Sequence, residues 1–312
     1  MTHDDPIRIF CGADRSQWLA LRVFEHSVRR HTARAVEVAL IDNALAPLPD
    51  DPRHAPYTEF SFARFAIPKL CGYRGHAVYM DSDMLVFADI GELWDTPMEG
   101  AKIAIEVGAR AATEPGKHAA VMLLDCAALR WDVDEIVAGL GTRYGYKPLM
   151  QIDPLLAPGE MRELIPSGWN DLDAYRPGTT RNLHYSRIKT QPWVHAGHPD
   201  GHLWVAELQR LLETGGVTAE QLRVEVREGY ARPSLLIELG IEPAPEGLQT
   251  SDAAAMNAFD AAQGFVPHRK LVQRAGERRR AIARRQRDEA SARTPWLGWW
   301  HRARYRWRFG RD

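Results

Sequence analysis

The feature that most constrains the fold is an apolar segment, residues 77–87, which is interrupted by two aspartates, Asp81 and Asp83. An apolar run of this length is expected to form a strand buried on both faces, as in a parallel sheet covered by helices. The two carboxylates then lie at the end of a core strand. Side chains two residues apart on an extended chain point to the same side, so these two can converge on one point.

Two carboxylates this close together need a positive partner, because each raises the pKa of the other and both lose hydration. A divalent cation is the simplest partner. Mg²⁺ or Mn²⁺ suits carboxylates that share the ion with the phosphates of a substrate. The alternative is a strand-end turn with two solvated acids, and the segments on either side of the motif favour the metal.

The N-terminal segment has the pattern of a nucleotide-binding βαβ unit. Residues 7–11 are predicted to form a strand, apolar residues recur at helical spacing from Trp18 to Val28, and residues 36–40 alternate as a second strand. The first turn of such a unit is where α/β sheets place a nucleotide. Asp14 in that turn either contacts the nucleotide or caps the following helix.

The alternation between helical and extended patterns continues over residues 58–70, 103–107, 121–125 and 132–140. It predicts a single, mostly parallel sheet. Within the first of these segments, Pro68 is expected to disturb the end of a helix. Arg64 on that helix either pairs with the aspartates, faces an anionic ligand or is solvated.

Composition narrows the class of protein. The chain has 312 residues, of which 45% are hydrophobic, enough for one large core or two modest ones. It shows neither an apolar run near 18 residues nor a charged-then-apolar leader, so we expect no membrane span, no secretory signal and a cytoplasmic location. Cys11, Cys71 and Cys126 are far apart and are expected to be buried free thiols.

Charge is distributed unevenly along the chain. Residues 268–312 carry 15 Lys or Arg and 4 Asp or Glu, whereas the preceding part has a net charge of −12. Aromatic residues interleave with arginines over 296–309, a pattern that suits the inner face of the plasma membrane. We expect a catalytic domain over 5–265 and a basic, aromatic-rich, helical tail over 266–312 that binds this surface peripherally. The alternatives are nucleic acid, which we do not expect as a partner, and a tail without a partner.

Four stretches together resemble the retaining sugar-nucleotide transferases of glycosyltransferase family 8. They follow the order and spacing of the family, and they are residues 7–14, 61–93, 164–170 and 184–193. The resemblance implies an α/β fold of the Rossmann-like GT-A type, with a mostly parallel central sheet. It also implies metal-dependent transfer of a hexose, with retention, from a nucleotide sugar to a glycan or lipid-linked acceptor. A UDP-sugar is the expected donor.

The same resemblance implies a set of site residues. Asp81, Asp83 and His184 would bind Mn²⁺ or Mg²⁺, and the imidazole favours Mn²⁺. Gln151 or Asp153 would take the catalytic position beside the donor sugar. The nucleotide and its phosphates would contact Gly12, Ala13, Asp14, Arg64, Ser82, Arg187 and Lys189.

The chain departs from the family pattern at three places. The usual His-x-x-Gly-x-x-Lys-Pro-Trp has Arg187 in place of the glycine and one extra residue before Pro192, so either Arg187 or Lys189 is the phosphate cation. Residues 118–121 replace the usual Asn-Ser-Gly-Val. The usual Asp-Gln pair is present only as Gln151 and Asp153, separated by one residue.

Two other functions fit parts of the pattern. A haloacid-dehalogenase-like phosphatase also places Asp-x-Asp at a strand end with Mg²⁺, but the threonine that commonly follows the second aspartate by two is Leu85 here. A decayed transferase that only binds a sugar nucleotide or a membrane surface is the other alternative.

Overall fold

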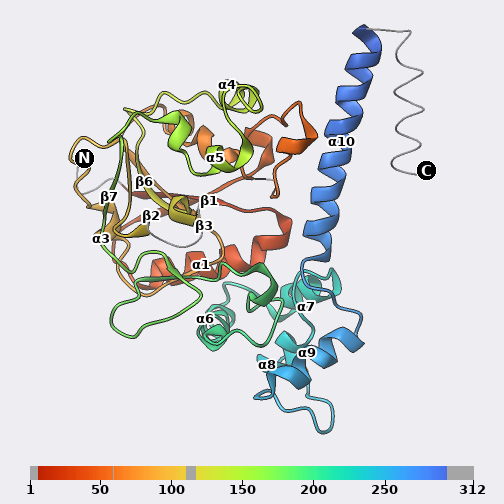
Figure 1. Cartoon of the computed structure of the whole chain (residues 1–312). Coiled ribbons are helices and arrows are strands. Elements are labelled where there is room, and N and C mark those ends of the chain that lie inside the picture. Colours follow the sequence, from red (N-terminus) through yellow and green to blue (C-terminus); the bar gives the residue numbers. More distant parts are fainter. Residues whose placement is uncertain (1–5, 59, 110–116, 294–312) are drawn as a thin grey trace.

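The computed structural model describes residues 6–58, 60–109 and 117–293 (Figure 1). Its strands are β1 (Ile7–Gly12), β2 (Val36–Ile41), β3 (His76–Asp81), β4 (Met84–Val86), β5 (Ile103–Glu106), β6 (Val121–Asp125), β7 (Met161–Ile165), β8 (Asp171–Leu172) and β9 (Asn182–His184). Its helices are α1 (Trp18–Arg30), α2 (Ile67–Leu70), α3 (Gly91–Trp94), α4 (Val133–Ala138), α5 (Tyr146–Met150), α6 (Gly201–Glu213), α7 (Ala219–Arg227), α8 (Ser234–Glu238), α9 (Ala253–Ala262) and α10 (Arg269–Arg293).

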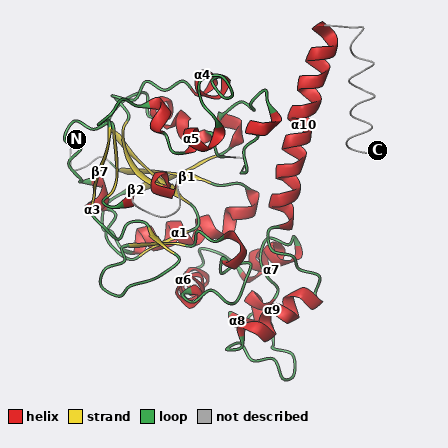
Figure 2. Cartoon of the chain, viewed as in Figure 1, coloured by secondary structure: helices red, strands yellow, loops and turns green. Residues whose placement is uncertain are grey.

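A six-stranded sheet lies at the centre of the described residues, in the order β2-β1-β3-β6-β5-β7. Strand β6 pairs antiparallel with β3 and β5, and the other pairs are parallel, so five of these strands share one direction. The predicted α/β class with a mostly parallel sheet is confirmed. Figures 1 and 2 show the helices on both sides of the sheet, with α4 and α5 over one face and α1 over the other.

Covered faces explain why the strands are apolar at consecutive positions. In β3, Tyr79 packs in a cluster with side chains from α4 and α5, whereas Val78 and Met80 pack in a second cluster with Phe24 and Val28 of α1. Successive side chains of a strand point to opposite faces, so both sets must be apolar when both faces are buried.

The chain leaves the central sheet at the acidic motif. Strand β3 ends at Asp81, the chain bends at Ser82 and Asp83, and β4 then joins β9 and β8 in a second, three-stranded sheet. The expectation of a single sheet was therefore wrong, and the two aspartates do not share one extended strand. Because β4 pairs with β9, Met84 lies opposite His184, and the second sheet brings a distant histidine to the motif.

The segment before the motif also differs from the prediction. Thr58 lies in a bend and residues 60–62 form a turn. Ala63–Ala66 is a 3₁₀ turn, and only Ile67–Leu70 of the predicted helix is α-helical among the described residues. Pro68 lies in the first turn of α2, where no backbone N–H is needed and its fixed φ suits the helix. The proline therefore helps to begin a helix and does not disturb the end of one.

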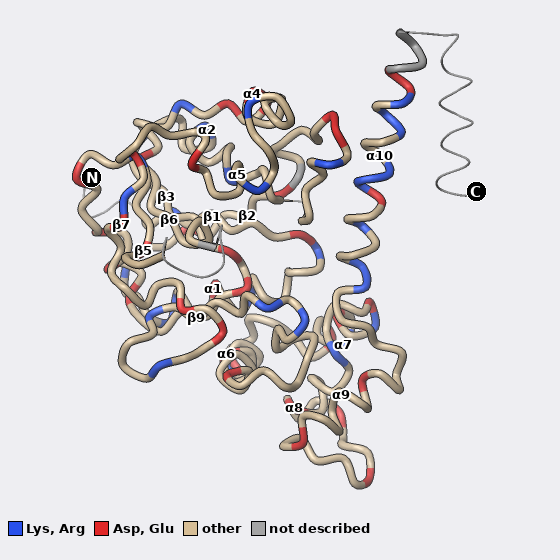
Figure 3. The backbone as a smooth tube through the Cα atoms, viewed as in Figure 1, with Lys and Arg blue, Asp and Glu red and all other residues tan. Residues whose placement is uncertain are grey.

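Helix α10 carries much of the basic charge of the C-terminal segment (Figure 3). Two of its arginines contact the loop before the acidic strand: Arg278 donates to the Tyr57 carbonyl at 2.6 Å, and Arg285 donates to the Pro49 carbonyl at 2.9 Å and to the Asp50 carboxylate at 2.8 Å. The aromatic stretch 296–309 lies outside the described residues, so membrane binding stays a prediction.

The remaining sequence expectations concern thiols and membrane spans. All three cysteines are free thiols, as predicted, and Cys11 and Cys126 are buried, whereas Cys71 is only half-buried and in this respect differs from the prediction. Over the residues that the structure describes, no helix combines the length and the apolar character that a membrane span requires.

The end of β1 is tightly packed and provides a test of this part of the fold. A Cβ atom on Gly12 would lie 2.3 Å from Cδ2 of Phe60. Gly12→Ala is therefore expected to lower the free energy of unfolding by about 1–3 kcal/mol, the usual cost of overpacking. Urea titration measures this, with Gly145→Ala as the control because its Cβ would lie 3.7 Å from Pro148. Equal stability of the two variants would show that Phe60 moves aside without cost.

Candidate active site

Asp81, Asp83 and His184 meet at the junction of the two sheets. Nε2 of His184 lies 3.3 Å from Oδ1 of Asp83 and 3.9 Å from Oδ2 of Asp81. One potential ligand atom from each residue lies within 4.8 Å of the other two. Among the described residues, these three therefore form a group that could hold a metal ion. His184 is buried, and both carboxylates are partly exposed to the cavity described below.

The two distances from His184 fit a small divalent cation. With ligand distances of about 2.1 Å, such an ion holds any two ligand atoms no more than about 4.2 Å apart. Both measured separations from Nε2 of His184 are below this limit. Two carboxylates and one imidazole match the ligand preferences of Mn²⁺, with Mg²⁺ as the harder alternative.

Each of the three side chains is held by a neutral polar partner. The Tyr79 hydroxyl donates to Oδ1 of Asp81 at 2.6 Å, and the Gln191 amide donates to Oδ2 of Asp83 at 2.8 Å. Nδ1 of His184 donates to the amide oxygen of Asn170 at 2.9 Å. This bond places the proton on Nδ1 and leaves the lone pair of Nε2 facing the aspartates, as a metal ligand requires.

The partner of the histidine is itself held by a buried carboxylate. Glu106, at the end of β5, accepts the Gly168 N–H at 2.5 Å in the turn that carries Asn170. Burial raises the pKa of Glu106, and the N–H groups of Gly168, Trp169 and Asn170 oppose that shift. A chain of contacts thus connects the central sheet to His184.

Arg64 supplies positive charge beside the motif. Its Nη2 lies 3.8 Å from Oδ1 of Asp81, and its guanidinium stacks over the Tyr79 ring at 4.5 Å. Burial raises the pKa of Asp81, the Arg64 charge lowers it and the Asp83 charge raises it again. Arg64 therefore keeps part of the charge of the acidic pair compensated, in agreement with the first alternative left open by the sequence.

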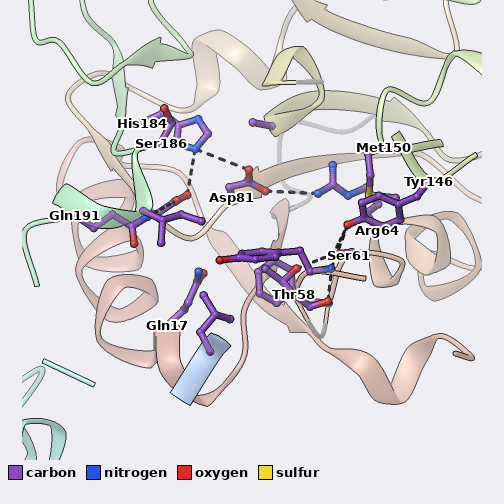
Figure 4. Close-up of a pocket in the computed structure, with 16 residues that line it drawn as sticks. Gln17, Thr58, Ser61, Arg64, Asp81, Tyr146, Met150, His184, Ser186 and Gln191 are labelled. Carbon is purple, nitrogen blue, oxygen red and sulfur yellow. Dashed lines mark hydrogen bonds and ion pairs between the residues drawn. The ribbon is translucent and has the colours of Figure 1, made fainter. Parts of the chain in front are cut away.

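The three side chains face a cavity of about 260 Å³. Figure 4 shows His184 and Gln191 on one side of Asp81, and Arg64 with Tyr146 on the other. Leu271 of α10 also lines the cavity, so the C-terminal helix forms part of its wall. Further polar side chains in the wall are Gln17, Thr58, Ser61 and Ser186.

The predicted nucleotide-binding turn lies next to the acidic motif. Gly12 pairs in parallel register with Asp81. Asp14 caps the following 3₁₀ turn by accepting the Ser16 N–H at 2.7 Å, while its Oδ2 is buried without a hydrogen-bond partner in the described structure. Both roles considered for Asp14 are therefore compatible with its position. Ala13 is buried beside it.

Other predicted residues lie at the edge of the site or outside the cavity wall. The hydroxyl of the buried Ser82 donates a hydrogen bond to the side-chain oxygen of Gln17. Ser82 thus contacts a residue of the cavity wall. Arg187 and Lys189 are exposed, and Nε of Arg187 lies 3.6 Å from Oδ2 of Asp173. Neither cation lines the cavity, so the choice between them stays open.

The two candidate catalytic residues are not brought into the cavity wall. Gln151 follows the last residue of α5, and its carbonyl accepts a hydrogen bond from Nε2 of His118 at 3.1 Å. Asp153 is exposed in the next turn. The wall at this point is formed by Met150, and the catalytic role of either residue stays a prediction.

Comparison with known proteins adds a sequence-family match to this geometry. The family model described as "Glycosyl transferase family 8" matches residues 14–121, which include both aspartates. This segment belongs to glycosyltransferase family 8. The predicted resemblance is thereby confirmed over the segment, and the match favours a transferase over the phosphatase alternative.

A curated relative matches part of this chain. Protein CDI of Arabidopsis thaliana is 38% identical over 99 residues, which cover 29% of this chain and 36% of that protein. The chain thus matches about a third of the length of this relative.

Three solved glycosyltransferase structures show partial similarity in fold. The bifunctional glycosyltransferase WbbM is 15% identical, with 66% of this chain and 50% of that chain covered and a TM-score of 0.48. The galactosyltransferase LgtC, solved with donor and acceptor sugar analogues, is 16% identical, with 64% and 95% covered and a TM-score of 0.46. GlyE of Streptococcus pneumoniae TIGR4 is 14% identical, with 64% and 60% covered and a TM-score of 0.48. Similarity at this level concerns the fold alone.

Sequence reasoning missed most of the residues that hold the ligand set. Tyr79 could have been found, because it lies two residues before Asp81 on the same side of β3. Asn170 and Gln191 reach the site through loops and carry no periodic signal. Tyr146 and Leu271 enter the wall from helices far along the chain, and only the tertiary fold places them there.

The bond between Asn170 and His184 provides a test of the candidate metal site. Asn170→Ala removes the acceptor that fixes the imidazole, and loss of such a partner typically lowers metal affinity about 10- to 100-fold. Calorimetric titration with Mn²⁺ measures the change. Gln209→Ala is the control, because Gln209 bonds only to the exposed Glu213 among the contacts described. Unchanged Mn²⁺ affinity in Asn170→Ala would argue against His184 as a ligand.

Proposed function

We propose that this chain is a metal-dependent, retaining glycosyltransferase that moves a hexose from a nucleotide sugar to a glycan or lipid-linked acceptor. A UDP-sugar is the donor that we expect. The observation that carries the proposal is the convergence of Asp81, Asp83 and His184 in one cavity. The two aspartates belong to the family 8 segment. Mn²⁺ is the proposed cofactor, with Mg²⁺ as the alternative.

The chemistry follows from the charges that meet in this cavity. A bound divalent ion would stabilise the negative charge that grows on a nucleoside diphosphate as the bond to the sugar breaks. Arg64 adds a fixed positive charge on the side of Asp81 away from His184. Tyr79, Gln191 and Asn170 hold the ligand side chains in place, so little reorganisation is needed when the charge develops.

The C-terminal segment supports a proposed location at a membrane surface. Arg279, Arg280 and Arg284 are exposed on α10, and each cation near an anionic bilayer contributes about 1 kcal/mol. We propose that these residues and the segment 296–309 hold the enzyme at the cytoplasmic face of the plasma membrane. The division into a catalytic domain over 5–265 and a tail over 266–312 is part of the same proposal.

Metal-dependent nucleotide binding is the direct test. We expect UDP to bind in the presence of Mn²⁺, and we expect Asp83→Ala to lower the affinity by about 100-fold or more, because a ligand is lost outright. Isothermal titration of UDP with and without Mn²⁺ measures this. Asp134→Ala, which removes an exposed carboxylate at the start of α4, is the control for net charge.

The outcomes separate the remaining alternatives. If UDP and other nucleoside diphosphates fail to bind with Mn²⁺ present, the proposed function is wrong. If UDP binds but no UDP-sugar is hydrolysed or transferred, the chain is a binding module derived from a transferase. Hydrolysis of an aryl phosphate that depends on Asp81 would instead support the phosphatase.

A further inference from the structure

A row of three hydroxyl groups lines the cavity on the side of Arg64, away from His184 (Figure 4). Oγ1 of Thr58 lies 2.8 Å from Oγ of Ser61, and the Tyr146 hydroxyl donates to the same Oγ at 3.2 Å. Thr58 and Ser61 belong to the turns before α2, whereas Tyr146 begins α5. Two segments far apart in the sequence thus contribute to one row.

The positions of these hydroxyls are fixed by their surroundings. The Tyr146 ring packs edge-on against Phe62 with ring centroids 5.9 Å apart, and its hydroxyl accepts the Tyr57 N–H at 3.4 Å. Ser61 is only 4% exposed, and its hydroxyl also donates to the Thr58 carbonyl at 3.2 Å. A subsite held in this way loses little entropy when a ligand binds.

The chemistry of the row suits an uncharged ligand with several hydroxyl groups. Each hydroxyl is both a donor and an acceptor, so the bonds along the row can reverse to match either direction of a ligand hydroxyl. A phosphate would instead be bound by cations. Among the described residues that line the cavity, Arg64 is the cation on this side. The groups of a nucleotide sugar that match the row are sugar hydroxyls, on the pyranose or on the ribose, and binding of UDP alone separates the two.

The size of the cavity agrees with a subsite for one part of a ligand. Its volume of about 260 Å³ lies just below the range of about 300–1,000 Å³ that is typical of sites for whole drug-sized ligands. The space beside the candidate metal ligands can therefore hold a sugar ring next to the phosphates, with the remainder of a nucleotide sugar outside it.

We propose that Thr58, Ser61 and Tyr146 form the subsite for the hydroxyl groups of a pyranose bound beside the metal site, and that they determine which sugar is accepted. This inference rests on the proposed function. It assigns the sugar contacts to residues in the cavity wall, whereas Gln151 and Asp153 lie outside that wall. It also gives the loop before α2 a role in specificity that its sequence does not indicate.

The test compares binding of a nucleotide with binding of its sugar conjugates. Tyr146→Phe and Thr58→Val each remove one hydroxyl and keep the shape of the side chain. In the presence of Mn²⁺, both variants are expected to bind UDP within twofold of the wild type. Of UDP-glucose and UDP-galactose, the one that the wild type binds more tightly is the test ligand. Each variant is expected to bind it about five- to tenfold more weakly than the wild type does, the effect of one lost hydrogen bond. Isothermal titration gives both values.

Tyr144→Phe is the matched control. It makes the same change two residues earlier in the chain, where the hydroxyl donates to the Ile136 carbonyl at 2.7 Å and does not line the cavity. It should leave the ratio of the UDP and UDP-hexose affinities unchanged. A further arm titrates methyl glucoside and methyl galactoside into the complex with UDP and Mn²⁺, because a pyranose can also come from the acceptor.

Each outcome decides a different question. Selective loss of UDP-hexose binding supports a donor-sugar subsite, and selective loss of glycoside binding supports the same subsite for the acceptor sugar. If UDP and UDP-hexose weaken equally, the row contacts the nucleotide part and the inference is wrong. If neither changes, the row only ties the loop to α5, and the inference is wrong as well. If wild-type protein fails to bind UDP or any other nucleoside diphosphate, the proposed function itself fails, and the inference fails with it.

Discussion

The structure depends on the repulsion between two neighbouring carboxylates. Asp81 and Asp83 lie at the point where the chain passes from one sheet to another, and an apolar strand leads directly to them. Without compensation, two partly buried charges at this distance would be costly. The fold places the positive charge of Arg64 beside Asp81, and each acid accepts a hydrogen bond from a neutral side chain. A bound cation shared with His184 would compensate the rest of the charge. The second sheet is best understood in this context, because β9 delivers the histidine.

Much of the central architecture was predictable from local pattern. The apolar runs of β1, β3, β5 and β6 and the helical spacing of α1 result from burial on both faces of a sheet, and burial leaves a periodic trace in sequence. The bend at Ser82 was not predictable in this way, because an apolar run on both sides of it looks like one strand. Pro68 was misjudged for a related reason: its effect depends on whether it lies at the start or at the end of a helix.

The candidate site was predictable only in part. Asp81 and Asp83 are two residues apart in sequence, and the family resemblance added His184. The groups that orient them come from a strand, a turn and a loop that meet only in the folded chain. Glu106 is an example: it acts on His184 through the turn at 168–170, two contacts away from any ligand atom. The roles of such residues depend on tertiary packing, and no regular spacing in the sequence indicates them.

Helix α10 has a mechanical consequence. It has 25 residues, which corresponds to a rod about 37 Å long. One end contributes Leu271 to the cavity, and arginines farther along it hold the loop at 48–57. A surface that bound the C-terminal end of α10 would therefore be separated from the cavity by a distance that the length of the helix determines. Under the proposed function, only acceptors that project far enough from that surface would reach the cavity, so the length of this helix would itself select among them.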